Sequence, residues 1–203
     1  MTQETTKCGV VAVLGAPNAG KSTLVNQLVG QKVAITSAKA QTTRARMMGI
    51  ALHGNTQMIL VDTPGIFAPK RRLDRAMVSA AWEGAEAADA VLIVTPEYSR
   101  TYPGVLKDAV DWAARPWGQN SWAGKPLAIT GASPGAIGTA IAQHHLRTTM
   151  VAAGTAVMGQ PELYYTFKPE HYGADGAITD ESTRTFVENW LGSFADWIEK
   201  TGK

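Results

Sequence analysis

The stretch GVVAVLGAPNAGKST occupies residues 9–23 and decides the fold of the amino-terminal part of the chain. It opens with a short apolar run, Gly9 to Leu14, that is typical of a buried β-strand. The residues that follow, Gly15 to Ser22, fit the pattern G-x-x-x-x-G-K-S, and leucines at helical spacing come next. A strand, a glycine-rich loop and a helix in this order are the context that a phosphate-binding loop requires.

The residues of this loop suit the capture of phosphate. Glycines let backbone amides turn toward phosphate oxygens, and the start of a helix adds positive potential. Lys21 would supply a positive charge, and the Ser22 hydroxyl would bind Mg²⁺. The residues expected to surround the phosphate are Asn18, Ala19, Gly20, Lys21, Ser22 and Thr23.

A second motif supports this interpretation. The segment DTPG begins at Asp62, directly after an apolar run, and ends at Gly65. An acidic residue there would reach the Mg²⁺ shell from beside the loop, and the amide of Gly65 would meet a γ-phosphate. The segment alone is an ordinary turn, but together with the first motif it indicates a nucleotide site.

Apolar runs and helical spacings alternate along the rest of the chain. Strands are predicted at residues 9–14, 46–52, 58–61, 90–95, 126–130 and 154–158. Helices are predicted after residue 21 and at residues 73–87, 103–114, 137–149 and from 180 onward. Alternation of this kind predicts an α/β fold with a three-layer, doubly wound and mostly parallel sheet. The predicted strand order is 2-3-1-4-5-6, with strand 2 antiparallel.

Composition excludes several classes of protein. The 203 residues carry a formal net charge of +2 and no long run of like charge, so we expect no nucleic-acid partner. The single cysteine, Cys8, excludes a disulfide framework and is expected to be a small buried residue. No apolar run approaches the roughly 20 residues of a membrane helix, and the first residues lack a signal peptide. These features predict a cytoplasmic protein without a membrane partner.

Aromatic usage changes abruptly near residue 95. Residues 1–95 contain only Phe67 and Trp82, whereas residues 96–203 contain five Trp, five Tyr and three Phe. The change falls inside the apolar run ADAVLIV, where no linker composition is present. We therefore predict one merged domain over residues 1–203, built from a first part, 1–93, and a second part, 94–203.

The first part, from about residue 8 to 93, resembles an Era-like GTPase, one of the ribosome-assembly GTPases. The segments GAPNAGKSTLVNQLVGQKVAITS, KAQTTRARMMGI and DTPGI match that family's phosphate loop, first switch and second switch in order. The resemblance implies that Thr42 or Thr43 closes on Mg²⁺, beside Ser22 and Asp62. It also implies that Ile66 replaces a catalytic glutamine. The family's guanine-reading motif, N-K-x-D, does not occur in the sequence.

The second part, from about residue 90 to 200, resembles NADPH-dependent FMN reductases, which are flavodoxin-like and include quinone and chromate reductases. TPEYSRTYPG, GKPLAITGASPGAIG and GQPELYYTFKPE carry this likeness. It implies that the loops containing Glu97, Tyr98 and Ser133 border the ring of FMN, and that residues 96–203 form any homo-oligomer contact. From spacing alone, these loops are equally consistent with turns that close two strands. The family's own FMN-phosphate loop is replaced here by the G-x-x-x-x-G-K-S loop.

We interpret the chain as an engineered chimera of these two families. The phosphate loop follows strand 1, and the Glu97 and Ser133 loops follow strands 4 and 5, so all would face one crevice. The favoured function is weak binding of nucleotide phosphate, as GDP or GTP with Mg²⁺, without efficient catalysis. The alternatives are an FMN-binding oxidoreductase remnant and a folding scaffold without function. Whether the GTPase or reductase activity of either family persists stays open, because neither site is complete.

Overall fold

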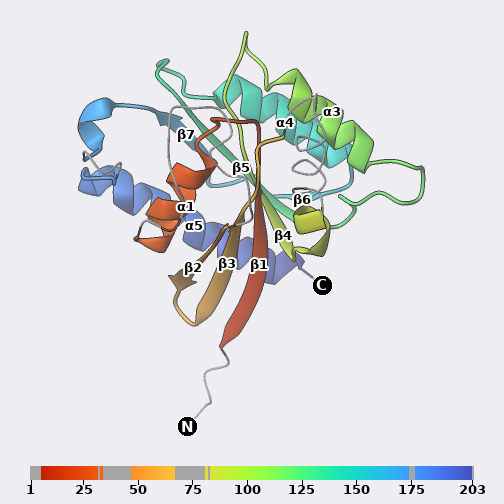
Figure 1. Ribbon diagram of the computed structural model, residues 1–203, viewed down its shortest axis with the longest axis horizontal. Helices are drawn as coiled ribbons and strands as arrows, with labels where there is room; N and C mark the ends of the chain where they lie inside the picture. Colours follow the sequence, from red (N-terminus) through yellow and green to blue (C-terminus); the bar gives the residue numbers. More distant parts are fainter. Residues whose placement is uncertain are drawn as a thin grey trace.

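The computed structural model describes residues 6–31, 33, 47–66, 81, 83–173 and 177–202. Its centre is a seven-stranded sheet in the order β2-β3-β1-β4-β5-β6, with β7 also paired to β5 (Figure 1). The strands are β1 (Lys7–Leu14), β2 (Met47–His53), β3 (Thr56–Asp62), β4 (Ala90–Val94), β5 (Pro126–Ser133), β6 (Ala156–Val157) and β7 (Leu163–Thr166). The helices are α1 (Lys21–Val29), α3 (Gly104–Ala113), α4 (Ala140–Ala152), α5 (Glu181–Thr201) and the 3-10 helix η1 (Pro169–His171).

The pairing of the strands confirms the predicted sheet order. β2 and β3 are antiparallel, and the other pairs are parallel. One strand was not predicted. β7 pairs with the carboxyl-terminal end of β5: Thr130 lies opposite Leu163, and Ser133 lies opposite Thr166. β6 pairs only with the beginning of β5. Pro161 lies between β6 and β7, and proline has no N–H to give to a strand ladder, so the edge of the sheet is split into two short strands.

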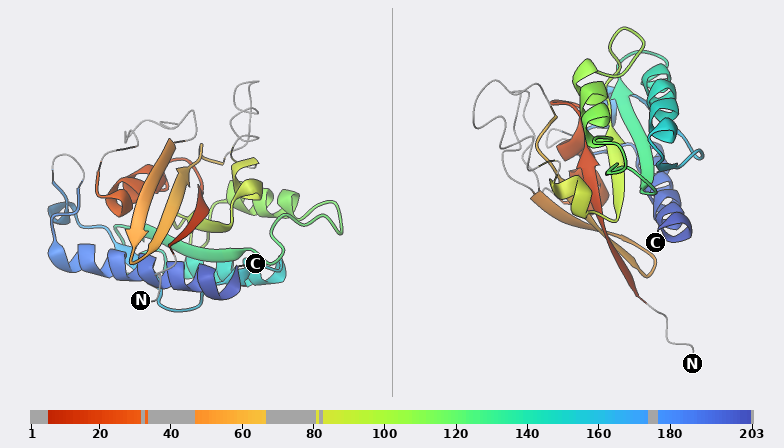
Figure 2. Two further views of the ribbon diagram at one scale, coloured as in Figure 1. Left: turned by 90° about the horizontal axis from the view of Figure 1, so that it is seen from below. Right: turned by 90° about the vertical axis from the view of Figure 1, so that its right-hand side faces the viewer.

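Helices cover both faces of the sheet and give the predicted three layers. α1 and α5 pack on one face, and α3 and α4 pack on the other. Successive residues of β1 show the alternation, because Val11 and Val13 belong to the first cluster while Ala12 and Leu14 belong to the second. The left panel of Figure 2 shows α5 running beneath the strands for most of the length of the molecule.

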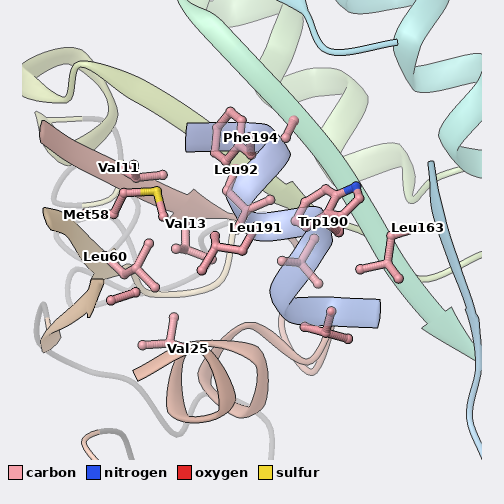
Figure 3. Packing of buried hydrophobic residues seen from close by; sticks show 14 of the residues in the cluster. Val11, Val13, Val25, Met58, Leu60, Leu92, Leu163, Trp190, Leu191 and Phe194 are labelled. Atoms are coloured by element: carbon pink, nitrogen blue, oxygen red, sulfur yellow. The ribbon is translucent and has the colours of Figure 1, made fainter. Parts of the chain in front are cut away.

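The apolar cluster under α5 contains residues from both sides of position 93. Trp190 and Phe194 of α5 are buried, and they pack with Val11 of β1 and Met58 of β3 (Figure 3). A fully buried large apolar side chain contributes about 1.5–3 kcal/mol relative to exposure. Contacts between α5 and the first strands are therefore a main source of stability for this face of the sheet.

Two expectations are wrong in detail. Cys8 is exposed, because it lies near the beginning of β1, where the first two residues of the strand are exposed and burial starts only farther along. α4 begins at Ala140 and not at residue 137, because the chain turns at Gly138 with a φ of 57° before the helix starts.

Of the helix expected at residues 73–87, the structure describes Ala81 and residues 83–87, which are helical. No helix in the described part of the chain is long and apolar enough to cross a membrane.

Candidate phosphate-binding site and adjoining chamber

The loop between β1 and α1 has the backbone conformation that its sequence predicts. Asn18 and Gly20 adopt left-handed φ angles of 57° and 90°, so the chain curls tightly before the helix begins. Gly20 is the N-cap of α1, and no side chain there covers the first amides of the helix. These amides therefore face the loop from the positive end of the α1 dipole, as an anion site requires.

Lys21 is held inside the loop. Its side chain is buried, and its Nζ donates hydrogen bonds to the carbonyl oxygens of Ala16 at 3.0 Å and Gly15 at 3.3 Å. Burial lowers the pKa of Lys21 from 10.5 to about 8, although the negative charge of Asp62 opposes this shift. Below about pH 8 the loop therefore carries a buried positive charge that peptide carbonyls and one carboxylate only partly compensate.

Ser22 and Asp62 meet beside this charge. The Ser22 Oγ donates a hydrogen bond to Asp62 Oδ2 at 2.5 Å, and Asp62 is fully buried at the end of β3. A hydroxyl and a carboxylate are hard oxygen donors, the type of ligand that Mg²⁺ prefers. The donor set present here fits that ion. Thr42 and Thr43, the two alternatives expected at the metal, lie outside the described residues.

The segment after Asp62 is fastened against the loop. Ile66 N donates to the Gly15 carbonyl at 2.9 Å. A Cβ on Gly65 would lie 2.8 Å from the backbone N and Cα of Pro17, so only glycine allows this approach. The two motifs predicted from the sequence are thus in direct contact.

The residues expected to border a flavin ring, Glu97, Tyr98 and Ser133, bind other parts of the protein or are exposed. Glu97 Oε2 accepts hydrogen bonds from the amides of Ile141 and Ala142 at 3.1 and 3.0 Å, so its carboxylate caps the start of α4. Tyr98 is 57% exposed, and Ser133 Oγ accepts a hydrogen bond from the amide of Gly135 at 3.1 Å. The structure therefore gives Glu97 and Ser133 internal partners. Glu97, Tyr98 and Ser133 are not among the residues that line the cavity beside α1.

A chamber of about 320 Å³ adjoins the loop on the α1 side of the sheet. One side is formed by the start of α1, including Gly20 and Thr23, and the base is formed by the ends of β4 and β5. The opposite wall is aromatic and comes from β7 and the segment after it. Its residues are Tyr165, Phe167 and Tyr172.

The rings of this aromatic wall support one another. Tyr172 packs against Phe167 with ring centroids 5.1 Å apart, and against Tyr165 at 6.3 Å in an edge-on arrangement. Burial raises the pKa of Tyr172, and a hydrogen bond with Tyr165 adds to this effect, so its ring stays neutral. Sequence reasoning did not assign this wall. The available signal was the aromatic cluster in LYYTF, whose first four residues form the unpredicted strand β7.

The sheet order and the helices on both faces define a doubly wound α/β protein. The model of the NADPH-dependent FMN reductase family matches residues 10–170, and the chain belongs to this family. The match begins in β1, earlier than the motifs alone predicted. Both families open with a strand, a loop and a helix in a doubly wound sheet, which allows one family model to run across residue 93.

Individual relatives match the chain in parts. GTPase Era of Erythrobacter litoralis is 85% identical over 98 residues, which are 46% of this chain and 32% of that protein. A 2-hydroxy-1,4-benzoquinone reductase from Burkholderia is 51% identical over 111 residues, which are 55% of this chain and 61% of the relative. The chain thus spans less than two thirds of either relative.

Solved structures show the same two likenesses. The flavoenzyme NAD(P)H:acceptor oxidoreductase FerB from Paracoccus denitrificans has a TM-score of 0.68 and 35% identity, over 98% of this chain and all of that one. Era in complex with MgGDPNP and a segment of 16S ribosomal RNA has a TM-score of 0.60 and 28% identity, over 91% of this chain and 57% of that one. Together with the partial matches, these findings identify the chain as a chimera of an Era-like part and a reductase-like part.

Proposed function

We propose that this chain binds nucleotide phosphates, as GDP or GTP with Mg²⁺, in the loop between β1 and α1. The observation that carries the proposal is the buried charge of Lys21 next to the Ser22–Asp62 hydrogen bond of 2.5 Å. A phosphate group would complete the compensation of the Lys21 charge that Asp62 begins, and the first amides of α1 would donate to the phosphate oxygens.

Each residue of the loop has a distinct part in this binding. The backbone from Asn18 to Thr23 would surround the phosphate, and Lys21 would turn its Nζ from peptide carbonyls to phosphate oxygens. Ser22 and Asp62 would hold Mg²⁺, which neutralises phosphate charge when bound. The amide of Gly65 lies in the segment packed on Pro17, where a terminal phosphate would approach the loop.

We expect binding to be weak and hydrolysis to be inefficient. The sequence lacks the N-K-x-D motif, so no aspartate of that motif can read guanine. Hydrolysis also needs a group that orients the attacking water. Ile66 is buried among apolar side chains and has no polar atom on its side chain, so it cannot fill that role.

Flavin-dependent reduction is the second candidate function. It is favoured by the match to the reductase family and by the likeness to FerB over that whole chain. The loop would then bind the phosphate of FMN, and the turn that contains Ser133 would border its ring. We rank this function second because Glu97, on the other expected ring-bordering loop, is engaged by the α4 amides.

The parent families also suggest location and partners. We propose a cytoplasmic protein that binds a nucleotide or phosphate ligand and forms any homo-oligomer through residues 96–203. The low net charge of +2 gives little electrostatic attraction for nucleic acid.

The test is to identify what the purified protein releases on heating, before and after soaking with Mg-GDP and with FMN. Release of guanine nucleotide, resolved by chromatography, supports the proposal. Release of a compound with flavin absorption, and no guanine nucleotide, would replace it with the second candidate. If neither soak leaves a ligand on the protein, both functions are rejected and the chain is a folded scaffold.

A further inference from the structure

We propose that the chamber beside the phosphate loop holds the base of a bound nucleotide, and that it accepts different bases with similar affinity. This inference rests on the proposed phosphate binding and adds the class of ligand: a nucleoside phosphate whose ring stacks on Tyr165, Phe167 and Tyr172. The base would be selected for its flat apolar faces and not for the pattern of polar groups on its edge.

The position of the chamber leads to this assignment. Gly20 and Thr23 belong to the expected phosphate cradle and also line the chamber. A ligand with phosphate at the start of α1 would therefore reach the chamber along these shared residues. Figure 1 shows α1 and β7 on the same side of the molecule, and the chamber lies between them.

Size and chemistry of the chamber fit a ring. Its volume of about 320 Å³ is at the lower end of the range for small-molecule sites, which begins near 300 Å³. Phe167 is 43% exposed although it is large and apolar, and Tyr172 packs against it at 5.1 Å. A flat ring that covered Phe167 would remove this apolar surface from water and add stacking contacts.

Two of the polar side chains at the chamber are already engaged in hydrogen bonds within the protein. Thr130 Oγ1 donates to the Leu163 carbonyl at 3.2 Å, and Gln27 Oε1 accepts from the amide of Ile178 at 3.0 Å. Among the described residues that line the chamber, none is Asp or Glu. Stacking without edge recognition tolerates every base, because every base has a π-face.

The chamber is a product of the junction between the two parts. Gly20, Thr23 and Gln27 lie in the Era-like part, whereas Phe167 and Tyr172 lie in the reductase-like part. Neither part alone contains both walls. The expected tolerance for different bases is therefore a property of the chimera and not of either part alone.

The experiment measures the dissociation constants of Mg-tripolyphosphate, Mg-GTP and Mg-ATP for the whole chain by calorimetric titration. The test variant is Phe167→Ala, which removes an exposed ring from the wall. The matched control is Phe186→Ala on α5, because Phe186 is similarly exposed, at 46%, and is not among the residues lining the chamber.

We expect GTP and ATP to bind within about threefold of each other, and both about tenfold more tightly than tripolyphosphate, since stacking one base adds this much affinity or more. Phe167→Ala should remove most of that tenfold gain and leave tripolyphosphate binding unchanged, while Phe186→Ala changes nothing. Equal affinity for tripolyphosphate and nucleotides would overturn the inference and leave phosphate binding intact. A preference of about 100-fold for GTP over ATP would also overturn it, because it requires a base reader. Failure of all three ligands to bind would reject the proposed function and this inference together.

Discussion

A Cβ atom on Gly15 would lie 2.1 Å from the carbonyl oxygen of Val94. Gly15 follows β1 in the Era-like part, and Val94 ends β4 at the first position of the reductase-like part. The loop between β1 and α1 therefore begins in direct contact with the junction of the chimera. The geometry of the loop depends on how well the two parts fit at this one point.

Replacing Gly15 by alanine should destabilise the protein by about 2–4 kcal/mol, because the methyl group clashes with backbone and the φ of 152° is strained for an L residue. Urea unfolding measures the change. Gly104→Ala is the control, since no atom lies within 4 Å of a Cβ there and alanine favours the helix. Equal stability of Gly15→Ala and the unsubstituted chain would mean that β1 and β4 are farther apart than described.

The lowered pKa of Lys21 predicts a pH dependence of stability. Between about pH 8 and pH 10.5 the unfolded chain keeps a proton on Lys21 that the folded chain has released, so this residue makes the free energy of unfolding rise with pH. Below pH 8 the cost of burying the charge is fully present. The stability of Lys21→Met relative to the unsubstituted chain should therefore fall by roughly 2 kcal/mol between pH 7 and pH 10.

Lys107→Met is the control for that measurement. A hydrogen bond with Asp111 raises the pKa of Lys107, so this side chain stays protonated in both states across most of the same range. Its substitution should give a stability difference that is nearly constant with pH. A Lys21→Met difference that is equally constant would show that Lys21 is not buried as described.

The carboxylate of Glu97 should contribute to stability through α4. Glu97→Gln removes the negative charge that faces the first amides of this helix, at a cost of about 1–2 kcal/mol. Chemical denaturation measures this, with Glu188→Gln on the exposed side of α5 as the control. If Glu97→Gln leaves stability unchanged but weakens FMN binding, the residue has the flavin-site role that its loop resembles.

The cluster under α5 predicts that both parts unfold together. Phe194→Ala should cost about 3–5 kcal/mol, because Phe194 is fully buried among residues of both parts. Hydrogen exchange should show the same loss of protection at Val13 in β1 and at Ile129 in β5. A loss confined to one strand would mean that the two parts are separate folding units.

Much of the fold follows from the sequence because its signals are local. The apolar runs specify the strands, and the G-x-x-x-x-G-K-S loop fixes the connection from β1 to α1, with Gly20 in the left-handed conformation it needs. Asp180, the predicted start of the last helix, is the N-cap of α5, and its side chain accepts a hydrogen bond from the amide of Thr183 at 2.7 Å.

The remaining features depend on contacts between distant residues. β7 is only four residues long, and it forms because β5 extends beyond its predicted end to pair with it. The role of Glu97 follows from where α4 begins, which no local pattern shows. The aromatic chamber needs Thr23 and Phe167 on opposite walls, although they come from different parent families.

Binding of nucleotide phosphate by the loop between β1 and α1 is the proposal on which the other functional inferences rest. A calorimetric titration of Mg-GDP into the unsubstituted chain and into Lys21→Ala tests it most directly. We expect saturable one-to-one binding that Lys21→Ala weakens by about tenfold or more, because a charge-assisted contact to phosphate is lost. Equal binding by both proteins, or none by the unsubstituted chain, would contradict it.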